Sequence, residues 1–299
     1  MDTPGVGIAH IYWLAHAAGR QARQKRVDGG RMIFQITHSR ARVLVGGAMP
    51  LAAAALLFAS AASAQGRPGP QSPQAVAPID LTGYWVAVVT EDWRWRMMTP
   101  PPGDYASVPM TALAREVADG WNLEADIRDG NACRPYGAGG IMRVPTRLHI
   151  SWEDSDTLKI ETDAGSQTRL LHFGAFTPAA QATWQGNSSA EWEFTGGGRG
   201  QPPTGGSLKV VTTDLKMGYV RWNGVPYGEN AVVTEYFDYH PAFGQEWFTV
   251  ATLIDDPEYF TEPFLVSNHF RKEADGANWN PTPCVTEPPV RDTPAESER

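Results

Sequence analysis

From Asp80 onward the chain is divided into short segments in which apolar and polar residues alternate, with turn-forming residues between them. Alternation with a period of two is typical of strands that bury one face of a sheet. No strand–helix–strand unit carries a glycine-rich turn, which argues against a nicotinamide- or flavin-binding α/β fold. The pattern predicts a mainly β chain, folded as a single antiparallel barrel.

About nine or ten strands are expected, and a sheet of that size usually closes or folds over on itself. The opening strand begins near Gly83, and the others are expected at residues 147–152, 157–163, 166–173, 190–194, 208–214, 218–222, 231–239, 246–255 and 264–271. One short helix is expected at residues 110–121, where three apolar residues recur at helical spacing: Leu113, Val117 and Trp121.

The three segments between residues 147 and 173 predict which side chains point into the barrel. One register places their apolar residues on a common face: Leu148, Ile150, Trp152, Leu158, Ile160, Leu171 and Phe173. Arg169 and Gln167 share that face by the same alternation. The interior is therefore expected to contain at least one charged side chain.

A secretory signal precedes the barrel. Two arginines, an apolar run at 43–62 and the small-residue site Ala62-Ser63-Ala64 follow the order of a signal peptide. Cleavage after Ala64 would remove residues 1–64, an upstream extension plus the signal, and leave a periplasmic or secreted protein. The alternative is an uncleaved anchor, because the run is about long enough to span a bilayer. Residues 65–79 then form a flexible tether, 80–285 the barrel domain and 286–299 a disordered tail.

The exported chain is strongly acidic. Residues 1–64 contain seven of the 25 Lys and Arg and two of the 33 Asp and Glu, so 18 basic and 31 acidic residues remain, a net charge of −13. Nucleic acids and anionic membrane surfaces are not expected partners, because phosphate binding needs clustered Lys and Arg. No membrane insertion is expected after cleavage. The sequence gives no indication of the oligomeric state.

Both cysteines, Cys133 and Cys284, belong to the exported part of the chain. An oxidising compartment would allow them to form a disulfide. Two unrelated buried thiols are the alternative. The histidines match no metal-ligand spacing, so neither a metal nor another cofactor is expected.

Gly83-Tyr84-Trp85, at the start of the first strand, resembles the Gly-x-Trp signature of lipocalin-like (calycin) barrels. That resemblance implies a tryptophan packed at the closed end of the barrel, with an arginine of the last strand stacked across it. Arg271 is the matching candidate. The chain is also similar to uncharacterised exported proteobacterial proteins that begin "DLTGYW", from which no activity follows.

The opening strand is expected to continue to Met97. If Trp85 points inward, alternation sends every second residue inward with it: Ala87, Val89, Glu91, Trp93, Trp95 and Met97. A β-bulge in so long a strand would invert its later half and bring Asp92, Arg94 and Arg96 inside instead.

A barrel of eight or more strands is wide enough to hold one small ligand, and tryptophans supply rigid apolar walls with N–H donors. The sequence therefore predicts a cavity for an apolar, cyclic or aromatic small molecule. The ligand-binding residues expected are Trp93, Trp95, Met97, Gln167 and Tyr236. The alternative is that these rings only fill a wide barrel.

An enzyme in the same cavity is the second hypothesis. It requires an acid or base held away from water beside a partner of opposite charge. Glu91, Arg169, Glu235 and Tyr105 are the catalytic candidates, with Arg143 or Asp92 as a further charged partner. Such a set suits a cofactor-independent isomerase, or a lyase or hydratase.

Overall fold

The computed structural model describes residues 71–284. The predicted extension and signal (1–64), the start of the tether (65–70) and the tail (286–299) lie outside the described residues. Residues 71–79, the rest of the predicted tether, contact the barrel, where the indole N–H of Trp192 donates to the carbonyl of Pro73 at 2.9 Å.

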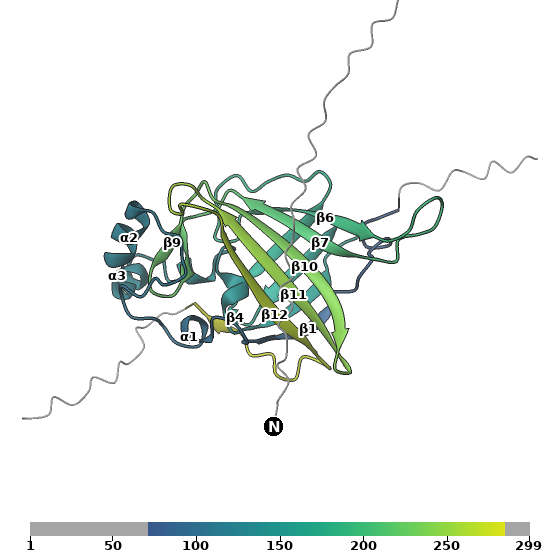
Figure 1. The fold of residues 1–299 in the computed structure, drawn as a ribbon, viewed down its shortest axis with the longest axis horizontal. Helices are drawn as coiled ribbons and strands as arrows, with labels where there is room; N and C mark the ends of the chain where they lie inside the picture. The colour runs from purple at the N-terminus through teal and green to yellow at the C-terminus, as the bar shows by residue number, and fades with distance from the viewer. Residues whose placement is uncertain (1–70, 285–299) are drawn as a thin grey trace, which may run out of the picture. The chain divides into compact units, whose positions relative to one another are not determined.

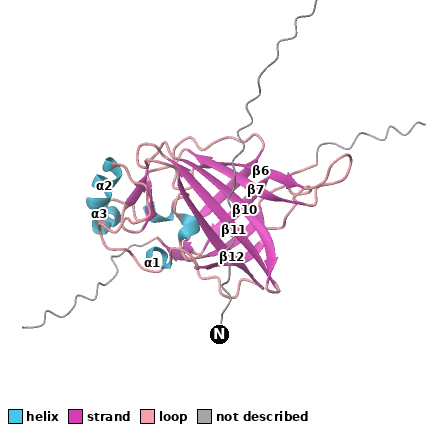
Figure 2. Cartoon of the chain, viewed as in Figure 1, coloured by secondary structure: helices cyan, strands magenta, loops and turns pink. Residues whose placement is uncertain are grey.

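Nine strands form a closed barrel, as the alternation predicted (Figures 1 and 2). They are β1 Gly83–Val88, β2 Arg147–Trp152, β3 Thr157–Thr162, β5 Thr168–Phe173, β6 Asn187–Thr195, β7 Gly205–Thr213, β10 Val232–Ala242, β11 Gln245–Asp255 and β12 Phe264–Glu273. Each pairs with the next barrel strand in sequence, and β1 pairs with β12 to close the ring.

The barrel is antiparallel at every junction except one. Strands β5 and β6 run parallel, with Leu171 opposite Ser188. Strands that reverse direction at each connection alternate up and down, so a ring with an odd number of strands cannot have all its junctions antiparallel. The crossover at residues 174–186 provides the longer connection that a parallel pair needs. The barrel is therefore antiparallel as predicted, except at this one junction.

Short elements gather at one end of the barrel (Figure 1). They are the helices α1 Trp93–Arg96, α2 Ala112–Asp119 and α3 Leu123–Arg128, the 3-10 turns η1 Arg134–Tyr136 and η2 Ile141–Arg143, and the hairpin β8 Gly218–Arg221 with β9 Val225–Tyr227. A buried apolar cluster that contains Ala114, Val225, Val233 and Ile254 joins α2 and β9 to barrel strands. We call this side of the barrel the capped end.

The described residues contain three helices instead of the single one expected, and the strand predicted at 218–222 belongs to a hairpin outside the barrel wall. The expected helix is α2. Its N-cap Thr111 accepts a hydrogen bond from the backbone N–H of Ala114 at 3.2 Å. The helix buries the small residues Ala114 and Ala118, and of the three apolar residues at helical spacing only Leu113 is exposed. None of the helices between residues 71 and 284 has the length and apolar character needed to cross a membrane.

The register of β2, β3 and β5 is the predicted one. Ile150 lies opposite Ile160, and Leu158 opposite Leu171. Because side chains alternate across a strand, this register buries these four residues together inside the barrel.

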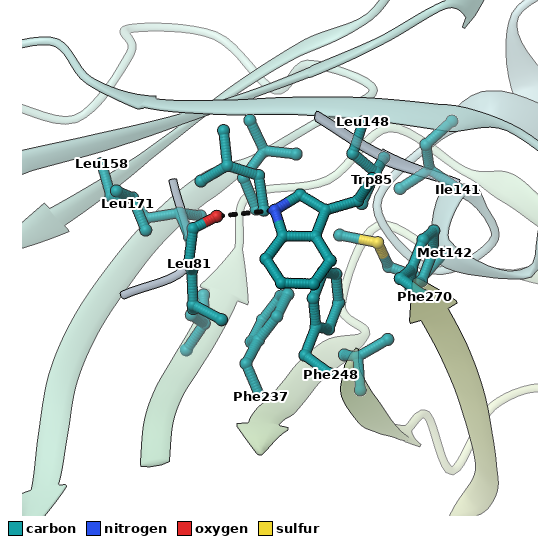
Figure 3. Close-up of a cluster of buried hydrophobic side chains, with 14 of the residues drawn as sticks. Leu81, Trp85, Ile141, Met142, Leu148, Leu158, Leu171, Phe237, Phe248 and Phe270 are labelled. Carbon is teal, nitrogen blue, oxygen red and sulfur yellow. Dashed lines mark hydrogen bonds between the residues drawn. The ribbon is translucent and has the colours of Figure 1, made fainter. Parts of the chain in front are cut away.

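Trp85 is fully buried within the larger apolar cluster (Figure 3). Its indole N–H donates to the carbonyl of Leu81 at 2.8 Å, and its ring meets Phe248 edge-on with centroids 4.8 Å apart. The cation over the ring is Lys272, whose amine lies 5.3 Å from the ring centroid. Arg271 was predicted there, but it pairs with Val86 and so lies on the outer face.

The cysteines Cys133 and Cys284 form a disulfide, with Cα atoms 5.2 Å apart. The bond joins the turn before η1 to the end of the described chain. There β13, Thr282–Pro283, pairs with β4, Ala164–Gly165. The disulfide thus ties the turn before η1, at the capped end, to the residue that follows β13, the last described strand.

The opening strand is shorter than expected. β1 ends at Val88, Asp92 takes a left-handed backbone conformation with φ of 50°, and α1 follows. The backbone N–H of Met97 donates to the carbonyl of Trp93 at 2.9 Å, which closes a helical turn. Trp93 and Met97, predicted to point inward, are 63% and 59% exposed. The helical turn breaks the period-two alternation on which that prediction depended.

Trp85→Ala should lower the free energy of unfolding by about 3–5 kcal/mol, because it leaves a large cavity in a packed interior. Trp93→Ala removes an equally large but exposed ring and should leave stability nearly unchanged. Urea denaturation of the two variants measures both. Equal stability of Trp85→Ala and the parent protein would show that the ring does not support the core.

Candidate functional site

Two groups of charged side chains lie within or against the barrel. The first is the pair Arg169 and Glu235, which are 1% and 0% exposed. The guanidinium donates to both carboxylate oxygens, at 3.1 Å and 2.5 Å, and also reaches the hydroxyl of Thr212 at 3.4 Å. Two-point contact of this kind is the strongest form of ion pair in proteins.

The pair belongs to a layer of polar side chains inside the barrel. Alternation places both residues inward, Arg169 on β5 and Glu235 on β10. Thr212 hydrogen bonds to Arg169 and to Ser188. Other barrel strands also carry buried polar residues: Thr252 and Asn268. Because each charge neutralises the other and neither reaches solvent, the pair is suited to holding strands β5 and β10 together rather than to contacting a ligand.

The other predicted catalytic residues make separate contacts. Glu91 accepts a hydrogen bond from the side-chain amide of Asn268 at 3.0 Å and pairs with Arg96. Tyr105 lies in the apolar cluster of the capped end and donates to Asp119 of α2 at 2.8 Å. Burial, with that hydrogen bond, raises the pKa of Tyr105. The predicted catalytic set is thus distributed over three local networks.

The predicted ligand-binding residues are dispersed as well. Gln167 lies beside the disulfide, where its amide donates to the carbonyl of Gly165 at 2.5 Å. Tyr236 is on the outer face of β10, because its neighbour Glu235 points inward. Trp93 and Met97 are exposed on and after α1. Trp95 is half-buried and lies against a second charged group.

This second group consists of three buried arginines at the capped end: Arg96 at the end of α1, Arg143 in η2 and Arg221 at the end of β8. They surround an enclosed space of about 10 Å³, together with Trp95, Gly140 and Trp222. That volume accommodates about one water-sized group. We call this space the arginine pocket.

Hydrogen bonds and ion pairs within the capped end hold two of these arginines in place. The Nε–H of Arg96 donates to the backbone carbonyl of Arg143 at 2.8 Å, while its Nη1 pairs with Glu91. Arg143 donates from Nη1 to Asp92 at 3.1 Å. Asp92 therefore has two roles. Its left-handed backbone conformation starts α1, and its carboxylate pairs with Arg143.

A tight turn positions Arg221. Asn223-Gly224 connects β8 to β9, and Gly224 has φ of +83°, a conformation that glycine adopts readily. The buried amide of Asn223 donates to the carbonyls of Pro101 and Asp104, at 3.2 Å and 3.1 Å. The guanidinium carbon of Arg221 then lies 4.7 Å from the centroid of the Trp95 ring.

The pocket is rich in N–H groups without a protein acceptor. Among the described residues that line the pocket, six buried nitrogens have no hydrogen-bond partner: Nη2 of Arg96, Nη2 of Arg143, Nε1 of Trp95, and all three guanidinium nitrogens of Arg221. Burial lowers the pKa of all three arginines; that of Arg221 falls to about 10, with a further contribution from the charge of Arg143. At neutral pH Arg221 is still protonated, so the pocket is positively charged.

An open groove of about 300 Å³ shares Arg96 and Trp222 with the arginine pocket. Its other walls are mostly apolar: Met97, Met98, Val144, Pro145 and Ala164. Met98 is 68% exposed. We call this space the apolar groove. Two residues of the groove wall thus also line the space that contains the cluster of N–H donors.

Sequence reasoning missed Arg221, Met98 and the groove. The β-bulge alternative placed Arg96 inside, and Arg96 is indeed buried, although a helical turn rather than a bulge buries it. Arg221 falls in a segment that the alternation assigned to the barrel wall. In the sequence, only the following Trp-Asn-Gly, which is typical of a turn, distinguished Arg221 from a residue of the barrel wall.

The comparisons with known proteins give no further guide to the site. No family model, no curated protein and no solved structure matches this chain. Within residues 71–284, no three His, Cys, Asp or Glu side chains come together in a metal-binding arrangement. The site must therefore be interpreted from its own geometry.

Glu235→Gln should lower the free energy of unfolding by about 3–5 kcal/mol, because it leaves the charge of Arg169 buried without a partner. The double variant Arg169→Met/Glu235→Leu should recover most of that loss. Glu191→Gln, which breaks the exposed pair with Lys209, is the control and should change stability little. Urea denaturation at pH 7 measures all three, and a double variant as unstable as Glu235→Gln would contradict a pair that acts as a unit.

Proposed function

We propose that this protein is a lipocalin-like binding barrel that takes an apolar, cyclic or aromatic small molecule in the apolar groove. The groove has the volume at which ligand sites for small organic molecules begin, about 300 Å³. Its walls are apolar side chains beside a few polar groups, the composition that such sites share.

The observation that carries the proposal is the exposure of Met97 and Met98, which line the groove and are 59% and 68% exposed. Trp93, one helical turn before Met97, is 63% exposed and lies outside the groove lining. Clusters of exposed apolar side chains mark binding surfaces more often than single ones do. Methionine also adapts its shape to different ligands, because its side chain is unbranched and flexible.

Packing of the barrel interior supports a site at the end rather than inside. Trp85, Phe237 and Phe270 each contact Phe248 in the buried cluster inside the barrel (Figure 3). The lipocalin-like part of the proposal draws on Gly83-x-Trp85 and on the cation of Lys272 over that ring. Export to the periplasm or the medium also belongs to the proposal, and a disulfide suits an oxidising compartment.

No specific contact favours the alternative of a cofactor-independent isomerase or lyase. That reaction needs its acid and base at one substrate. Arg169 and Glu235 are occupied with each other, and Tyr105 is bonded to α2. Binding without chemistry is the simpler function for a groove of this composition.

Fluorescence titration with N-phenyl-1-naphthylamine, an uncharged apolar probe, tests the proposal. The parent protein should bind it, and Met97→Gln/Met98→Gln should weaken binding by about tenfold or more, because apolar contact with the groove is lost. Phe243→Gln is the matched control, since Phe243 is 98% exposed in the β10–β11 turn and does not line the groove. Absence of binding, or equal affinity of the parent and the double methionine variant, would refute the groove as the site.

A further inference from the structure

We infer that the arginine pocket binds the carboxylate of the molecule whose apolar body lies in the apolar groove. The placement of the ligand's apolar body in the groove rests on the function proposed above. The carboxylate site stands on separate observations, which concern the charge balance, the size of the pocket and its connection to the groove.

The charge balance around the pocket leaves one arginine without a carboxylate. Arg96 pairs with Glu91, and Arg143 pairs with Asp92 at 3.1 Å. Asp104, the next nearby carboxylate, pairs with Arg94 at 2.9 Å. Arg221 is 1% exposed and has no ion pair within residues 71–284.

An unpaired charge in that position is costly. A buried guanidinium loses its hydration, and an ion pair or hydrogen bonds must replace it. In this protein Trp95 covers the guanidinium face of Arg221 at 4.7 Å, and the positive charge of Arg143 is nearby. A ligand anion would supply the missing negative charge and accept hydrogen bonds from several of the six nitrogens at once.

The size of the pocket selects the anionic group. A space of about 10 Å³ holds about one water-sized group, so it admits one oxygen of an anion and excludes a complete phosphate or sulfate group. Guanidinium groups match the planar edge of a carboxylate, which can accept two parallel hydrogen bonds from one arginine. A small, planar, singly charged group is therefore the best fit.

The connection to the groove selects the rest of the molecule. Arg96 and Trp222 line both the arginine pocket and the apolar groove. A ligand whose apolar part lies along Val144 and Met98 can thus extend a carboxylate towards Arg221. The chemical class is an apolar organic acid, such as an aromatic or cyclic carboxylate.

Isothermal titration with three probes tests the inference on the unmodified protein. The probes are 2-naphthoate, its uncharged analogue 2-naphthamide, and acetate. We expect 2-naphthoate to bind at least about tenfold more tightly than 2-naphthamide, because a charged hydrogen-bond partner contributes about that factor or more. Equal affinity for the acid and the amide would overturn the carboxylate site and leave the groove proposal intact.

Variants then locate the carboxylate. Arg221→Met should remove the preference for naphthoate over naphthamide, while the weaker binding of naphthamide should remain. Arg128→Met is the charge-matched control, since Arg128 is on the exposed surface of α3 and should keep the preference. Thermal melting checks the fold, and Arg221→Met should be at least as stable as the parent because it removes a buried unpaired charge. A preference that persists in folded Arg221→Met would place the carboxylate elsewhere.

The remaining outcomes separate the two proposals. Acetate that stabilises the parent protein but not Arg221→Met would support the carboxylate site even if no naphthalene compound binds, in which case the groove proposal alone fails. Inorganic phosphate that displaces naphthoate at micromolar concentration would make the pocket a site for a free phosphate and would overturn the organic-acid inference. Failure of both acetate and naphthoate to bind would overturn it as well.

Discussion

Closure of nine strands around a filled interior is the constraint on which the rest of this structure depends. The first and last strands of the barrel, β1 and β12, pair to complete the ring. Because the number of barrel strands is odd, one junction must be parallel, and it is that of β5 with β6. Trp85 and the phenylalanines around it then fill the interior. A barrel packed in this way leaves the ends and the outer surface for binding, and the described helices and the β8–β9 hairpin are all gathered at one end.

Arg169 and Arg221 show why we propose a binding site at that end. Both guanidinium groups are 1% exposed, so both lose nearly all contact with water. Arg169 recovers the loss through two hydrogen bonds to Glu235. Arg221 has the Trp95 ring against its guanidinium but no carboxylate, and it lines a pocket that shares Arg96 and Trp222 with an open apolar groove. The same residue type is thus used once for structure and once where a ligand can supply the counter-charge.

The sequence predicted those parts of the fold that depend on period-two alternation. Strand positions between 147 and 173, their register, and the inward direction of Arg169 and Glu235 all follow from the pattern of apolar residues. Alternation also sends consecutive residues of a strand to opposite faces, so Tyr236 could not point into the barrel together with Glu235. The prediction failed at residues 89–97, because the positive φ of Asp92 and the helical turn after it have no signature in the alternation.

The candidate site was beyond sequence reasoning for a different reason. It combines α1, η2 and β8, which are distant in sequence and meet only when the barrel is closed. Whether an arginine is paired depends on all of these elements at once, so no local pattern shows that Arg169 has a carboxylate partner and Arg221 has none. The same holds for the cation over Trp85, where a shift of one residue in register exchanges Arg271 for Lys272.

A crystal structure of the protein with 6-bromo-2-naphthoate would test the central claim most directly, because anomalous scattering locates the bromine independently of the rest of the map. The account predicts the bromine in the apolar groove between Met98 and Val144, with the carboxylate oxygens within hydrogen-bond distance of Arg221. Bromine density inside the barrel beside Trp85 and Phe248, or on the outer face away from α1, would contradict it.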